Sequence, residues 1–89
     1  MSTAHLNNHH RETLAQLMRH PVSHNVEWHD VLSLLQAVGT VEERQHGKVA
    51  VTVGAQMQVL EPPRHKDLEE QLVLDLRRML KEAGYGLEA

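Results

Sequence analysis

The sequence contains no cysteine and no phenylalanine, and Trp28 and Tyr85 are its only aromatic residues besides the histidines. Without cysteine the chain can form neither a disulfide nor a thiolate metal site, so its stability must come from apolar packing or from a partner. This absence also fits a reducing cytoplasm. Without phenylalanine, the core must consist mainly of leucine and valine.

Long apolar runs are also missing. No segment approaches the roughly 20 apolar residues that cross a bilayer, and the N-terminus lacks the basic and then apolar order of a signal peptide. The 89 residues include 9 basic and 12 acidic side chains, which give a formal charge of −3. Because nucleic-acid binding needs concentrated positive charge, only a local basic patch could contact RNA. We expect one soluble, cytoplasmic domain with no membrane contact.

The N-terminal segment predicts a short helix over residues 5–20. Leu14, Leu17 and Met18 lie at helical spacing, and Pro21 ends the pattern. This narrow stripe packs either on the rest of the domain or on another chain, and the second alternative predicts a homo-oligomer formed through this helix. We divide the chain into a histidine-rich helix and linker, residues 1–24, and a domain, residues 25–89.

A second helix is predicted from Asn25, a candidate N-cap, to Gly39, and its apolar face includes Trp28 as a core or interface residue. A last helix opens at Asp67, with Glu70 completing a variant of the capping box. Gly84 is its expected left-handed C-cap. On the polar face of that last helix, the expected ion pair joins Arg78 to Glu82.

Between these helices the sequence alternates in the manner of strands. Turn signals at His46-Gly47 and Gly54-Ala55 separate three candidate strands, and Pro62-Pro63 ends the last one. The fold class is therefore α+β, a short helix followed by α-β-β-β-α with a three-stranded antiparallel sheet. The strands are residues 40–44, 48–53 and 56–61. Met18, Met57 and Met79 are expected to serve in packing.

Two segments resemble known proteins: Glu61-Pro62-Pro63-Arg64-His65-Lys66, and the ending from Leu76 to Gly84. Together with the element order, they are similar to the HicA toxin family over about residues 25–85. The resemblance implies a fold like that of double-stranded-RNA-binding domains (dsRBDs). It also implies an mRNA-cleaving ribonuclease that an antitoxin protein neutralises.

The family's catalytic histidine lies in a glycine-serine-histidine phrase at the first hairpin. In this chain Lys48 stands where the serine belongs and Val49 where the histidine belongs, while His46 lies three positions earlier. We therefore expect a HicA-like domain that binds RNA or a protein partner without nuclease activity, because function depends on the site and not on the scaffold.

Two alternatives stay open. The first is a toxin mRNA interferase of a type II toxin-antitoxin system, with His46 or His65 as the catalytic group. Each histidine also has a structural interpretation, His46 as a turn residue that tolerates positive φ and His65 as an exposed loop residue. The second is metal binding by the histidine-rich start, where His5 and His9 would share a helical face, although a solvated tail is the simpler interpretation.

For RNA binding, the candidate residues are basic side chains of the first hairpin and of the loop before the last helix: Arg44, Lys48, Arg64, His65 and Lys66. Nearby acidic residues, Glu42, Glu43 and Glu61, dilute this patch, and scattered surface charge is the competing interpretation. No cofactor and no metal ion are expected. RNA, an antitoxin-like protein and a second copy of the chain are the candidate partners.

Overall fold

The computed structural model describes residues 7–19, 26–63 and 68–85. In chain order its elements are α1 (Asn8–Met18), α2 (Trp28–Val38), β1 (Thr40–Glu43), the short 3-10 turn η2 (Gln45–Gly47), β2 (Val49–Val53), β3 (Gln56–Leu60) and α3 (Glu70–Glu82). The α+β fold class and all three strands are confirmed. None of the helices in these ranges has the length and apolar character needed to cross a membrane.

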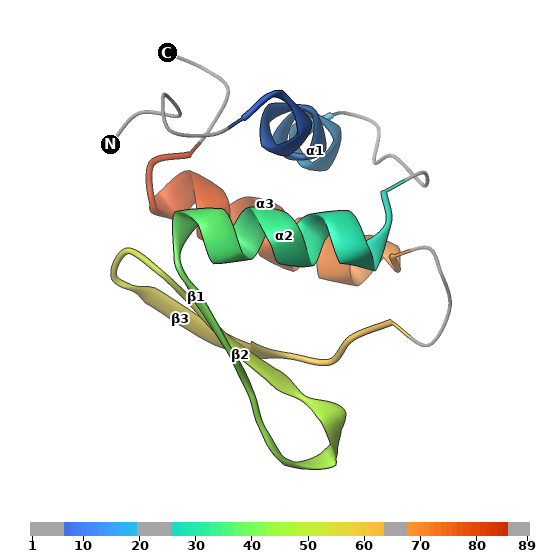
Figure 1. Cartoon of the computed structure of the whole chain (residues 1–89), viewed down its shortest axis with the longest axis vertical. Helices are drawn as coiled ribbons and strands as arrows, with labels where there is room; N and C mark the ends of the chain where they lie inside the picture. The colour runs from blue at the N-terminus through green and yellow to red at the C-terminus, as the bar shows by residue number, and fades with distance from the viewer. Residues whose placement is uncertain (1–6, 20–25, 64–67, 86–89) are drawn as a thin grey trace.

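The molecule has three layers. The antiparallel sheet, in the order β1-β2-β3, forms the first layer. Helices α2 and α3 lie side by side on one face of the sheet, and α1 lies on the other side of this helix pair, away from the strands (Figure 1). Helices α2 and α3 thus form a middle layer with neighbours on both sides.

The register of the sheet decides which side chains meet the helices. Val53 pairs with Gln56 across the Gly54-Ala55 turn, and Val51 pairs with Gln58, so both glutamines share the helix-facing side with the valines. Met57 and Val59 therefore lie on the outer face, where they are 58% and 50% exposed. The expectation that Met57 serves in packing was wrong, whereas Met79 is buried and Met18 packs against the core.

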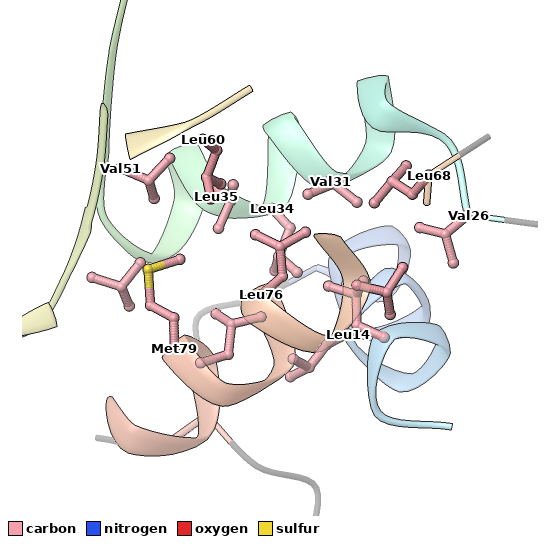
Figure 2. Packing of buried hydrophobic residues seen from close by; sticks show 14 of the residues in the cluster. Leu14, Val26, Val31, Leu34, Leu35, Val51, Leu60, Leu68, Leu76 and Met79 are labelled. Atoms are coloured by element: carbon pink, nitrogen blue, oxygen red, sulfur yellow. The ribbon is translucent and has the colours of Figure 1, made fainter. Parts of the chain in front are cut away.

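Leucine and valine dominate the core, as the absence of phenylalanine requires. Figure 2 shows these side chains converging from all three helices and from the sheet. Leu14 and Leu17 of α1 are 1% and 0% exposed, so the apolar stripe of this helix is used inside the domain. Of the two alternatives for this stripe, packing on the domain is correct. A homo-oligomer formed through these leucines is contradicted, because they have no exposed surface to offer a second chain.

Polar contacts also attach α1 to the rest of the molecule. The Arg77 guanidinium of α3 donates from Nε to the Leu17 carbonyl oxygen at 2.9 Å and from Nη2 to the Arg19 carbonyl oxygen at 2.7 Å. These carbonyls belong to the last turn and the C-cap of α1, where helical partners are missing. Arg77 therefore joins the end of α1 to the middle of α3.

The helix ends agree in part with the sequence-based expectations. Helix α2 begins at Trp28 and α3 at Glu70, each three residues after the expected N-caps Asn25 and Asp67, which lie outside the described residues. Gly84 has φ 96°, its N–H donates to the Lys81 carbonyl, and the Tyr85 N–H donates to that of Leu80. These two bonds form a Schellman motif and confirm the predicted C-cap.

The expected pair of Arg78 with Glu82 was wrong. Arg78 Nη2 instead lies 3.5 Å from Asp75 Oδ1, one turn earlier on α3, and Gln71 Nε2 donates to the same carboxylate oxygen at 3.1 Å. Spacings of three and four residues are both compatible with helical pairs, so the spacing alone could not choose between the two partners.

Gly39, between α2 and β1, is required for a different reason from the one expected. Its φ of −164° is extended backbone, which any residue adopts. A Cβ atom at this position would overlap the Thr52 carbonyl oxygen of β2. The chain can turn from the helix into the sheet at this place only because residue 39 has no side chain.

Candidate functional site

The tip of the first hairpin brings two of the predicted RNA-binding residues together. The Arg44 N–H donates to the Lys48 carbonyl oxygen at 2.7 Å, and the Lys48 N–H donates to that of Gln45 at 3.3 Å. Both cationic residues line a shallow hollow at this end of the sheet, with Val59 from the neighbouring strand on its wall. Arg64, His65 and Lys66, the other predicted members of the patch, lie outside the described residues.

The charge at this tip is mixed. Arg44 Nη2 lies 3.4 Å from Glu42 Oε1, and both side chains are largely exposed. A surface pair of this kind contributes about 0 to 1 kcal/mol, so the guanidinium can leave Glu42 for a stronger anion at little cost. Lys48 forms no ion pair with any residue in the described ranges, and its ammonium group is exposed.

His46 occupies the turn itself. It has φ 62° and ψ 29°, and Gly47 follows with φ 75°, so both are left-handed, as in a type I′ turn. The His46 residue is exposed, and none of the described residues donates a hydrogen bond to its ring or accepts one from it. General acid or base catalysis needs an oriented imidazole, so the geometry favours the conformational role of His46 over the catalytic one.

A second hollow lies between α2 and the first hairpin and has a volume of about 400 Å³. Its apolar lining comes from Trp28, Leu32, Val41, Val49 and Pro62, while Arg44 contributes the charge on its edge. The chain continues from Pro62 through Pro63 toward the basic segment 64–66. We call this feature the α2–hairpin hollow.

Val49 is the residue at the position of the family's catalytic histidine. Its side chain is 6% exposed, belongs to the core and contributes to the lining of the α2–hairpin hollow. A valine at this position supplies neither a proton donor nor a proton acceptor. The hollow therefore contains an aromatic ring, aliphatic walls and an arginine, but no general base from position 49.

The histidines of α1 have structural partners. His9 Nε2 lies 3.0 Å from Asp30 Oδ1, and His10 Nε2 lies 2.9 Å from Ser33 Oγ, so both rings contact α2. His29 Nδ1 lies 3.7 Å from the same Asp30 oxygen. Across residues 7–19, 26–63 and 68–85, no group of three or more such side chains could hold a metal ion. His5 lies outside these ranges, so the predicted face shared by His5 and His9 is not tested.

The α2–hairpin hollow was not predicted as a site from the sequence. The helical spacing of Trp28 and Leu32 places them on one face of α2, and that signal was visible. Their distance from Val49 and Pro62 depends on how α2 crosses the sheet, which is a tertiary relation that local pattern does not contain.

Comparisons of this chain with protein-family models, with curated proteins and with solved structures find no match. The similarity to HicA toxins rests on the segments 61–66 and 76–84 and on the order of the elements.

Proposed function

We propose that this chain is a HicA-like module with a dsRBD-like fold that binds RNA and does not cleave it. The order from α2 through the three strands to α3 agrees with that of the toxins it resembles. The observation that carries the binding proposal is the convergence of Arg44 and Lys48 at the hairpin tip, beside the α2–hairpin hollow. Two cations held by one turn can contact neighbouring phosphates.

The absence of cleavage is proposed from position 49. An RNA strand lying across Arg44 would meet an aliphatic wall at Val49, where the related toxins have their histidine. His46, the nearest substitute, is fixed by its turn and has no orienting partner among the described residues. A 2′-hydroxyl bound here would keep its proton, because no adjacent group is placed to accept it.

Titration of a short RNA duplex, followed by fluorescence anisotropy, tests this proposal. The double variant R44A/K48A is expected to bind roughly tenfold more weakly, and the slope of its log affinity against log salt is expected to become shallower by about 1 for each phosphate it no longer binds. Lys81→Ala removes one exposed charge from α3 and serves as the control. Absence of binding at low salt, or equal effects of both variants, would contradict the proposal. Growth arrest on expression that His46→Ala relieves would favour the nuclease alternative instead.

A protein partner is the second candidate function, and a specific observation favours it. The α2–hairpin hollow is mostly apolar, and the chain has a formal charge of −3, which opposes polyanion binding. Trp28 lines this hollow and is the only tryptophan of the chain, so its fluorescence reports occupation without a label. If a copurifying antitoxin-like protein shifts this emission and RNA does not, the protein partner is the correct assignment.

A further inference from the structure

Strand β3 has an open edge. It pairs with β2 on one side only, and no strand of the described part pairs with its other side. Because Val53 and Gln56 close a two-residue turn, Gln56, Gln58 and Leu60 direct their main-chain groups toward β2. The N–H and C=O groups of Met57 and Val59 therefore point outward. No described residue forms a hydrogen bond with these four groups.

The two edges of the sheet differ in their protection. β1 has the sequence Thr-Val-Glu-Glu, and two like copies of this edge would repel each other through Glu42 and Glu43. β3 has the sequence Gln-Met-Gln-Val-Leu, with no charge and no proline. Natural sheets usually protect their edges with charged residues, proline or bulges, and β3 has none of these. Pairing with another strand is therefore open to β3 and disfavoured at β1.

Helix α3 runs beside this edge without covering it. Two hollows of about 260 Å³ each lie between β3 and α3, and Gln58 lines both. Asp75 lies in the hollow on the Leu60 side of Gln58, and Arg78 lies in the one on the Gln56 side. The space next to the strand is thus accessible, and it carries one acidic and one basic group on opposite sides of Gln58.

We propose that two copies of this chain associate by antiparallel pairing of their β3 strands about a two-fold axis at Gln58. In this register Met57 lies opposite Val59 of the second copy, and Val59 lies opposite Met57. The four outward main-chain groups of each copy then form four N–H···O=C bonds across the axis. The two three-stranded sheets become one six-stranded sheet without a change in either fold.

The side chains fit a second copy of this chain because they are complementary under that axis. Met57 and Val59, exposed in one copy, cover each other on the outer face as cross-strand apolar pairs. The two Gln58 amides meet, and each can donate and accept. The axis also exchanges the two hollows, so Arg78 of one copy approaches Asp75 of the other. Glu61 lies opposite Ala55, so no like charges meet along the strands.

Sedimentation equilibrium over roughly 1 μM to 1 mM measures the association, since small interfaces of this kind bind weakly. The wild-type chain is expected to pass from monomer to dimer within this range. Gln58→Lys places two ammonium groups opposite each other, and Gln58→Glu places two carboxylates, so each variant alone is expected to remain monomeric. An equimolar mixture of the two is expected to form the dimer again. Thr40→Lys, on the β1 edge, is the matched control and is expected to associate as the wild type does.

Amide hydrogen exchange identifies the interface independently. The Met57 and Val59 amides are expected to exchange rapidly in dilute protein and to become protected as the concentration rises, while the amides of β1 do not change. A chain that stays monomeric at 1 mM overturns the proposal, with that concentration at the upper end of weak association. A dimer that ignores both Gln58 variants, or protection of this edge only when a different protein is added, overturns it as well. RNA binding by Arg44 and Lys48 is tested separately and can fail without affecting this result.

Discussion

Replacing Arg77 with methionine tests whether polar contacts hold α1 on the domain. The substitution keeps most of the apolar length of the side chain but removes the donors to the Leu17 and Arg19 carbonyls. A hydrogen bond that involves a charged group contributes about 1.5 to 3 kcal/mol, but the bond to Arg19 is exposed to solvent and contributes less. We expect the free energy of unfolding to fall by about 2 kcal/mol, and Tm by about 10 °C for a domain of this size.

Urea unfolding measures this loss, with Trp28 fluorescence and circular dichroism as two probes that must agree. Arg78→Met is the matched control, because Arg78 is 68% exposed and its one described pair, to Asp75 at 3.5 Å, is a surface pair. It is expected to cost less than about 0.5 kcal/mol. The protein must be dilute, so that association does not contribute to its stability. If Arg77→Met costs no more than its control, the two bonds do not stabilise α1.

Three further substitutions test the core and the first turn. Gly39→Ala is expected to cost more than about 3 kcal/mol in chemical denaturation, because the added Cβ meets the Thr52 carbonyl and the backbone must move; a cost below about 1 kcal/mol would contradict this contact. Leu34→Ala, at 0% exposure, is expected to cost about 2 to 5 kcal/mol, against under about 1 kcal/mol for Leu74→Ala, at 37% exposure, and equal losses would refute the assignment of the core. His46→Gly is expected to raise stability by up to about 1 kcal/mol and to leave RNA binding unchanged, because glycine adopts the φ of 62° without strain; lost binding would show that the imidazole contacts RNA.

The hairpins could be predicted because their signals are local. His46-Gly47 and Gly54-Ala55 provide the positive φ angles that tight turns need, and the valines between them alternate with smaller or polar residues. The capping glycine at position 84 is local in the same sense, since the hydrogen bonds it permits lie within one turn. For such elements, residues close in sequence decide the conformation.

The orientation of β3 shows where alternation alone is insufficient. A period of two divides a strand into two faces but does not say which face is buried. Apolar character favoured burial of Met57, yet the two-residue turn places Gln56 on the same side as the buried Val53. Turn geometry therefore overrides side-chain hydrophobicity at this strand, and a stricter use of the predicted turn would have given the correct face.

The candidate site was predictable only in part. One turn joins Arg44 and Lys48, so their proximity followed from the hairpin. Arg77 looked like one more charge on the polar face of α3, because the sequence does not show that the open carbonyls of α1 lie within its reach. The apolar hollow that Trp28 shares with Val49 depends likewise on how one layer lies on another.

The position of α2 between the sheet and α1 has a consequence for local opening. Amides in the centre of this helix can reach solvent only after one of two covers has separated, and each separation exposes leucines that are otherwise out of contact with water, such as Leu34 and Leu35. Strands at the periphery can fray singly. The inner helix is therefore the part of the chain whose opening most closely approaches complete unfolding.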